Sequence, residues 1–281
     1  MKLRPFEWIN IIALGLLVSC GTYIGNPEED DKTAQAQEIF DPTIADPSGV
    51  ADSKFTISLT DAPVDDLASF SIKIAELSAK QSEGSFIDIP VQVSDIDVLS
   101  YQNGDSIIFA ASEDIPEGTY TELRLVLDSE APVTATDSDG NTVEVNTSST
   151  PASGLKIDVE FTISEEDSTG LTLDFDLRKS LIKTGNNYKL NPILRAQNNQ
   201  DSYDIYGSGS ASVACAYEEG ATLDETDSCD NAISSSKFKS GAYRVAFLSP
   251  GTYTLRFFDE DGTYTDSETV TIVDSDISVN P

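Results

Sequence analysis

The sequence predicts an all-β protein in which two antiparallel β-sandwich domains follow a signal peptide and a disordered acidic linker. Three observations predict this class. From residue 54 onward, short segments alternate apolar and polar side chains with a period of two, which is typical of strands with one buried face. Turn-rich breaks separate these segments, and no amphipathic helical pattern exceeds about two turns. Many short strands at such spacing favour antiparallel sandwiches.

Residues 1–19 have the layout of a secretory signal peptide. Lys2 and Arg4 give a positive start, and a short apolar run follows over residues 9–18. This run is too short to span a bilayer, which takes roughly 20 apolar residues. We therefore expect these residues to be removed from the exported protein.

The sequence LVSC that ends at Cys20 resembles the cleavage motif of bacterial lipoproteins. We expect Cys20 to be acylated and to hold the protein to a lipid bilayer, because two or more acyl chains anchor a protein stably. Gly21 follows, and not the aspartate that resembles an inner-membrane retention signal, so the expected location is the bacterial outer membrane. The alternative is an ordinary signal peptide followed by a chance cysteine.

Residues 20–52 are expected to form a flexible linker, because they are rich in acidic residues and poor in side chains that could fill a core. The whole chain has a formal charge of −32 and no histidine. This charge disfavours nucleic acid and anionic lipid headgroups as partners, since both require cationic protein surface. It would attract divalent cations or basic partners, although an acidic surface that serves solubility is the favoured interpretation. The missing histidine removes the commonest general base and the usual zinc ligand.

Residues 53–197 are expected to form the first sandwich. Its strands follow from alternating segments at residues 55–60, 70–74, 123–127, 155–161 and 171–177. Residues 198–201 are a polar break, and residues 198–281 are expected to form the second sandwich. Its strands are expected at residues 212–217, 242–247, 252–257 and 268–273.

Cys215 and Cys229 are the only cysteines besides Cys20. In an exported protein an isolated pair is most simply a disulfide bond. A metal or redox pair is the disfavoured alternative, because the spacing is not C-x-x-C and no further soft ligand lies nearby.

Three segments of the first domain resemble a known family. They are LTDAPVDD at residues 59–66, EGTYTELRLVLD at 117–128 and LDFDLRKSLIKTGNNYKLNPILR at 173–195. Their order and spacing resemble the bacterial domain of unknown function 4382, over about residues 53–197. The resemblance implies a β-rich domain of an exported lipoprotein and no established activity. Residues 203–281 are similar to carboxypeptidase-regulatory-like or transthyretin-like sandwiches, although the cysteine pair is extra.

Asp61, Asp65 and Asp66 come where a predicted strand ends before Pro63. An aspartate before such a turn usually accepts backbone N–H bonds, which is the favoured role. The alternative is a carboxylate cluster for a hard cation such as Ca²⁺, which prefers oxygen ligands.

Asp174 and Asp176 are two residues apart, so on a strand both point away from the apolar face, with Arg178 and Lys179 close behind. The favoured interpretation is a polar outer face with local ion pairs, and the alternative is a ligand-binding patch. Residues 137–141 and 259–262 contain closely spaced acids and glycine, but they lie between predicted strands. Hairpin turns are therefore favoured over calcium loops there.

No catalytic constellation is apparent, and we expect a non-catalytic envelope protein that displays its domains for binding, adhesion or scaffolding. Sandwich domains present loops on a rigid frame, which suits recognition of a glycan, a peptide or an envelope protein. No cofactor is expected beyond the Ca²⁺ alternative. Two other functions stay open: a glycan-active enzyme that uses two carboxylates, and a passive spacer without a ligand.

Overall fold

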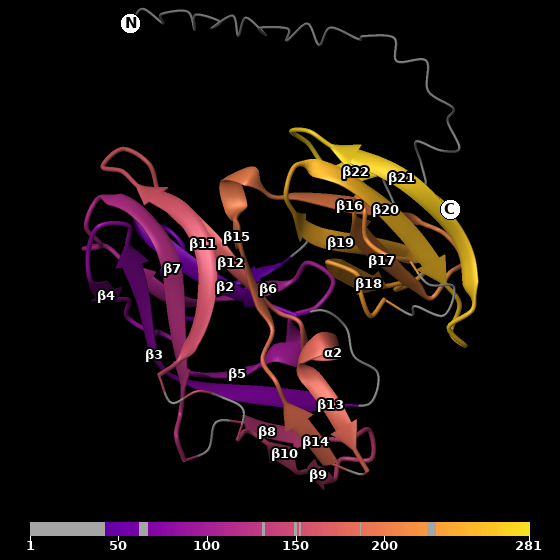
Figure 1. Ribbon diagram of the computed structural model, residues 1–281, viewed down its shortest axis with the longest axis horizontal. Coiled ribbons are helices and arrows are strands. Elements are labelled where there is room, and N and C mark those ends of the chain that lie inside the picture. Colours follow the sequence, from indigo (N-terminus) through magenta and orange to yellow (C-terminus); the bar gives the residue numbers. More distant parts are fainter. Residues whose placement is uncertain are drawn as a thin grey trace, which may run out of the picture.

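The computed structural model describes residues 43–61, 67–130, 133–148, 151, 153–185, 187–223 and 229–281. The described chain is all-β, as predicted, with only three short helical segments among its strands. Figure 1 shows two bodies: the chain up to about residue 200 forms the larger one, and the orange and yellow C-terminal part forms the other.

Two sheets form most of the larger body, which we call the first domain. The five-stranded sheet has the order β1-β6-β2-β12-β15. Its strands are β1 (Ile44–Ala45), β6 (Ser106–Ser112), β2 (Phe55–Thr60), β12 (Thr169–Phe175) and β15 (Leu194–Asn198). The other large sheet has the order β11-β7-β3-β8-β9, with β4 and β5 also paired to β3. Its strands are β11 (Leu155–Ile163), β7 (Gly118–Leu127), β3 (Ser69–Gln81), β8 (Val133–Thr136), β9 (Thr142–Val143), β4 (Phe86–Asp88) and β5 (Asp95–Asp97).

Short elements complete the first domain. A small sheet has the order β10-β14-β13. Its strands are β10 (Val145–Asn146), β14 (Asn187–Leu190) and β13 (Leu181–Thr184), and the short helices are η1 (Val98–Ser100), α2 (Leu177–Ser180) and η2 (Asn199–Asp201).

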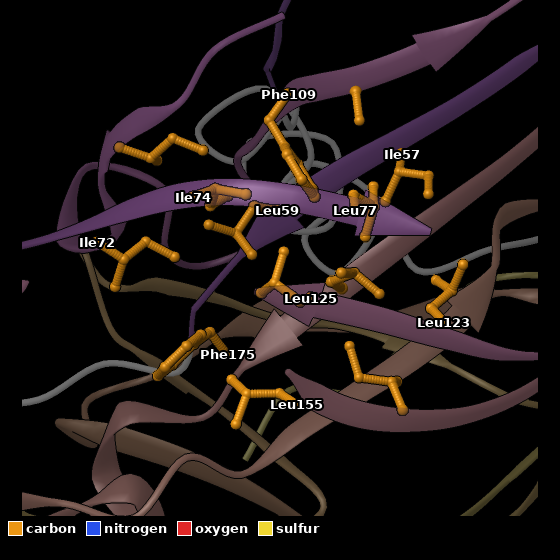
Figure 2. Packing of buried hydrophobic residues seen from close by; sticks show 14 of the residues in the cluster. Ile57, Leu59, Ile72, Ile74, Leu77, Phe109, Leu123, Leu125, Leu155 and Phe175 are labelled. Atoms are coloured by element: carbon orange, nitrogen blue, oxygen red, sulfur yellow. The ribbon is translucent and has the colours of Figure 1, made fainter. Parts of the chain in front are cut away.

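The core of the first domain lies between its two large sheets. Alternate side chains of β2 point inward, and Phe55, Ile57 and Leu59 are completely buried. Figure 2 shows Ile57 and Leu59 among side chains of β3, β6, β7, β11 and β12, which is the interleaving expected when two sheets pack face to face. Phe55 and Tyr120 both stack on the ring of Phe161 at centroid distances of 5.1 Å.

The smaller body, which we call the second domain, also consists of two sheets. Their orders are β19-β16-β22 and β18-β17-β20-β21. The strands are β16 (Tyr203–Ser208), β17 (Val213–Glu218), β18 (Ser234–Lys237), β19 (Ala242–Leu248), β20 (Gly251–Phe258), β21 (Tyr264–Ile272) and β22 (Ile277–Ser278). Tyr243 and Phe257 meet edge-to-face at 5.4 Å between these sheets. The hydrophobic clusters of the two domains share no residue among those described.

The structure differs from the sequence-based expectation in its strand directions and boundaries. Most strand pairs are antiparallel, but β2 and β12 run parallel to each other. Three shorter pairs are also parallel: β1 with β6, β10 with β14, and β16 with β22. The expected strand at residues 171–177 ends at Phe175, because Asp176 caps the one-turn helix α2.

The end of the expected flexible linker at residues 20–52 is ordered, which corrects that boundary. Ile44 and Ala45 pair with β6, and the Thr43 N–H donates to Asp105 Oδ1 at 2.8 Å. Asp46 then accepts the N–H groups of Val50 and Ala51, which fixes a turn before β2. Two apolar residues and one aspartate are therefore enough to pair this part of an acidic segment with the sheet.

The hairpin interpretation of residues 137–141 and 259–262 agrees with the structure. These residues connect β8 to β9 and β20 to β21, both antiparallel pairs. Asp137 Oδ1 accepts the N–H groups of Asp139 and Asn141, as an aspartate at the start of a turn does. No helix in the described ranges has the length and apolar character required to cross a membrane.

Candidate functional site

The junction between the two domains gathers most of the buried charge of the first domain. Figure 1 shows α2 below β18, on the side of the first domain that faces the second. Three aspartates of the first domain, Asp61, Asp174 and Asp176, are each at most 5% exposed there. Ionised groups are costly to bury unless they are paired and hydrogen-bonded, so their partners decide what the site can do.

Asp174 lies on β12 directly opposite Arg195 on β15. Arg195 Nη2 donates to Asp174 Oδ2 at 3.0 Å, and Arg195 Nη1 donates to the carbonyl of Phe247 in the second domain at 2.6 Å. Burial raises the pKa of Asp174, and the Arg195 charge opposes that rise. One guanidinium therefore joins a buried carboxylate of the first domain to the backbone of the second.

Asp176 also links the two domains, through the cations of α2. Its Oδ1 accepts the backbone N–H of Lys179 at 3.1 Å and so caps the helix. Its Oδ2 pairs with both Arg178 and Lys179, at 3.3 and 3.2 Å. Both cations also donate to the carbonyl of Ala232 in the second domain, Arg178 at 3.4 Å and Lys179 at 2.5 Å.

Asp61 follows β2 and fixes the start of α2. Its Oδ1 accepts the N–H of Leu177 at 3.1 Å, and its Oδ2 accepts Gln102 Nε2 at the same distance. Burial raises the pKa of Asp61 well above its usual value, and the nearby charges of Asp174 and Asp176 add to that rise. Asp61 thus accepts a backbone N–H, as favoured from the sequence, but the donor comes from a segment far along the chain.

The expectation of a polar outer face for Asp174 and Asp176 is wrong. Both side chains are buried, because cationic side chains that reach the second domain lie over them, Arg195 of the neighbouring strand β15 over Asp174 and Arg178 and Lys179 of α2 over Asp176. The expected local ion pairs form at Asp176, with Lys179 and Arg178, whereas Asp174 pairs with Arg195, 21 residues further along the chain. Within the ranges that the structure describes, no group of three or more potential metal ligands comes together. Asp65, Asp66 and Cys20 lie outside those ranges.

Two side-chain amides of the first domain extend the junction. Asn103, in the turn before β6, has a φ of 58°, a left-handed conformation that asparagine tolerates better than most residues. Its Oδ1 accepts the Ser236 hydroxyl and the Lys237 N–H of β18, at 3.1 and 3.0 Å. At the other end, the Ser249 hydroxyl donates to Gln197 Oε1 at 2.9 Å.

Phe247 receives the Arg195 bond in an unusual conformation. Its φ of 57° is costly for a bulky side chain, by roughly 1–2 kcal/mol. Both of its backbone polar groups are held: the N–H donates to Asp204 Oδ1 at 3.0 Å, and the carbonyl accepts Arg195. Arg244 pairs with Asp204 at 2.6 Å and keeps that carboxylate in place. The strained residue is therefore clamped by one charged side chain from each domain.

Sequence reasoning missed Arg195, Asn103 and the backbone groups of the second domain that the junction contacts. One signal could have found the cations. Residues 177–200 contain none of the 49 acidic residues but five of the 17 basic ones, in a chain of charge −32. Such a local excess of positive charge indicates that the segment faces something other than solvent. The acceptors are backbone carbonyls, which leave no trace in a sequence.

The predicted disulfide bond joins Cys215 on β17 to Cys229, with a Cα–Cα distance of 5.6 Å. Both cysteines are buried against Tyr217, Ala232 and Phe258. The Ala232 N–H donates to the Cys229 carbonyl at 3.1 Å, and the Ala232 carbonyl accepts Arg178 and Lys179, so the disulfide bond lies close to the part of the second domain that these cations contact.

Solved structures offer only remote similarities. They include the Bacillus anthracis TIE protein (10% identity, 80% of this chain and 56% of that chain, TM-score 0.23) and the major pilin subunit BcpA*(D312A) of Bacillus cereus (8%, 80% and 68%, 0.21). A third is the fimbrial anchor protein Mfa2 from Porphyromonas gingivalis (7%, 80% and 90%, 0.20). The chain spans little more than half of the TIE protein, and these scores are too low to transfer a function. No curated protein matches the chain.

A family model does match, and it agrees with the resemblance found in the sequence. The model of the domain of unknown function DUF4382 covers residues 52–192, which hold Asp61, α2 and the whole acidic side of the junction. The resemblance of residues 203–281 to transthyretin-like sandwiches stays a prediction. On the extent of this match, the chain belongs to the DUF4382 family.

Proposed function

We propose that this chain is a non-catalytic lipoprotein of the bacterial envelope. In this proposal acylated Cys20 anchors it to the outer membrane, and the two sandwich domains are displayed as one joined unit for adhesion or scaffolding. The observation that carries the proposal is the junction: Arg178, Lys179 and Arg195 hold buried carboxylates on one side and backbone carbonyls of the other domain. A scaffold that bears load or presents surfaces at a fixed distance needs such a fixed joint.

The use of the buried acids supports a non-catalytic role. A pair of carboxylates that hydrolyses a glycosidic bond must reach substrate and water. Asp61, Asp174 and Asp176 instead meet backbone N–H groups and cations inside the junction. Their arrangement serves the attachment of α2 and of the second domain.

The anchor is tested by metabolic labelling with an alkyne analogue of palmitate. We expect the wild-type chain and a Ser19→Ala variant to be labelled, because both keep a small residue before the cysteine. A Cys20→Ala variant should carry no label, and globomycin should cause the unprocessed wild-type precursor to accumulate. Label in the Cys20→Ala variant, or none in the wild type, would contradict the anchor.

The displayed part is tested by a thermal-shift screen of the full chain against glycans, envelope peptides and Ca²⁺. A partner that binds only the folded state stabilises it by about 2.7 kcal/mol at a hundredfold excess over the dissociation constant. A saturable shift with a glycan or peptide that is released unchanged supports the proposal. Turnover of a glycan that a single Asp→Asn substitution abolishes would replace it with the enzymatic alternative.

A further inference from the structure

A cavity of about 1050 Å³ lies between the two domains, beside the charged junction. Leu177, Leu181 and Tyr188 line it from the first domain, and Phe238 and Phe258 line it from the second. Ligand sites are commonly cavities of about 300–1,000 Å³ that are mostly apolar and lie between domains. The size, lining and place of this cavity agree with that description.

The charges around the cavity are not evenly placed. Arg178, Lys183 and Lys237 line it, and Arg178 and Lys237 are half-buried. Its acidic lining residues, Asp230, Asp259 and Glu260, are all exposed. Solvent and salt screen exposed charges more strongly than half-buried ones. The half-buried charges of the lining are therefore positive, whereas its acids and Lys183 lie where water screens them.

The Arg178 guanidinium beside the cavity has nitrogens that its partners leave unused. Its Nη2 pairs with Asp176 Oδ2, which also pairs with Lys179, and it donates to the Ala232 carbonyl. In the described part of the chain, Nε and Nη1 of Arg178 have no hydrogen-bond partner. An anion in the cavity would accept hydrogen bonds from these two nitrogens without displacing any bond between the domains.

We propose that this cavity binds an amphipathic organic anion, a molecule with an apolar body and one carboxylate or sulfonate group. The apolar body lies between Leu177, Tyr188, Phe238 and Phe258, and the anionic group lies toward Arg178, Lys183 and Lys237. The exposed acids at the cavity disfavour molecules with several negative charges. The site goes beyond the display role and does not depend on the lipid anchor.

The hairpin of β13 and β14 supplies a matched pair of test variants. Lys183 lies opposite Tyr188 in the register, and its ammonium is 5.9 Å from the centroid of that ring, on the side of the cavity. Lys189 lies opposite Ile182, so its side chain points to the other face of the same hairpin. Both lysines are exposed, so Lys183→Gln and Lys189→Gln should fold equally well.

The probes are naphthalene-2-sulfonate and its neutral counterpart naphthalene-2-sulfonamide, titrated calorimetrically into the full-length chain in one non-ionic detergent. We expect the sulfonate to bind saturably, and the sulfonamide to bind at least about tenfold more weakly because it lacks the charge. Lys183→Gln should weaken sulfonate binding about fivefold, as for an exposed ion pair, and addition of Lys237→Gln should weaken it further. Lys189→Gln should bind like the wild type.

Octanoate and the peptide N-acetyl-leucyl-phenylalanine then distinguish a lipid source of the anion from a peptide source, and saturable binding of either supports the site. Equal affinity for the sulfonate and the sulfonamide would overturn the proposal, because the charge would then be irrelevant. Equal losses in Lys183→Gln and Lys189→Gln would also overturn it, since binding would then follow net charge and not the cavity. Circular dichroism of each variant verifies that the fold is unchanged.

Discussion

Both domains bury apolar side chains between two sheets, but they differ in the size of the apolar cluster and in the presence of a disulfide bond. The first buries one contiguous cluster of apolar side chains between two large sheets, and its described part has no disulfide bond. The second is smaller, and its described apolar residues divide into separate clusters on the two faces of β17. Ala214 and Ala216 face the main cluster, whereas Cys215 and Tyr217 face the disulfide side.

The difference teaches what the second domain depends on. A small domain buries a smaller fraction of its surface, so it gains less from the hydrophobic effect. The disulfide bond, and the bonds from Arg178, Lys179 and Arg195 of the first domain, compensate for this smaller hydrophobic stabilisation. We therefore expect the second domain to respond more strongly than the first when either device is removed.

The largest effect is expected for Arg195→Met. The substitution keeps an unbranched apolar stem but leaves Asp174 buried without its cation and Phe247 without its donor. Removal of one partner of a buried ion pair costs about 3–5 kcal/mol, and we expect about 3 because Arg195 is 21% exposed. Urea denaturation monitored by circular dichroism measures the loss.

Lys189→Met is the control for this variant, since it removes a positive charge from an exposed site of the same acid-free segment. Its cost should stay within about 0.5 kcal/mol. If both variants lose the same stability, the loss comes from the change in net charge and not from the bonds of Arg195 to Asp174 and Phe247.

The next effect is expected when Cys215 and Cys229 are both replaced by alanine. The bond closes a loop with a sequence separation of 14, for which the chain-entropy model gives about 3 kcal/mol. Hydrogen exchange should speed up in β17 and β20 and stay unchanged in β2 and β7. A uniform increase in both domains would contradict the assignment of the bond to the second domain alone.

The smallest effect is a change in pH dependence for Asp61→Asn. Because the pKa of Asp61 is raised by burial, its stabilising contribution is full at low pH and is lost as pH rises through the raised value. The variant stays neutral, so its melting temperature should fall less than that of the wild type between about pH 4 and pH 8. Each unit of pKa difference is worth about 1.4 kcal/mol.

Asp137→Asn should change stability with the opposite sign. Hydrogen bonds from Asn141 hold the pKa of Asp137 below its usual value, so its contribution is present at neutral pH and is lost as pH falls. This variant should be destabilised at neutral pH and should match the wild type in acid. If both variants change stability in the same direction, burial is not the cause of the Asp61 effect.

The sequence was sufficient to predict several strands and the local turns. Alternation of apolar and polar residues located the strands that begin at Phe55, Leu155 and Ala242, although of these only the strand at Leu155 leaves its polar face exposed. Asp137 and the cysteine pair were predictable because their partners are close in the chain.

The junction was not predictable, because alternation shows which side chains share a face but not what covers that face. Asp174 lies on the polar face of its strand, and only the folded chain shows that it is buried beside Arg195, whose side chain reaches the second domain. The parallel pairing of β2 with β12 joins segments more than a hundred residues apart, for which a sequence contains no local signal.

The most direct test of the fixed joint is the distance between the domains in solution. Spin labels attached after the substitutions Ser138→Cys and Ser275→Cys would occupy exposed turns of the first and second domains, and double electron–electron resonance would record the distance distribution. We predict one narrow distribution for the otherwise native full-length chain and a broader one after Arg195→Met. A broad distribution before any clamp is removed would contradict the account, because the domains would then move independently despite Arg178, Lys179 and Arg195.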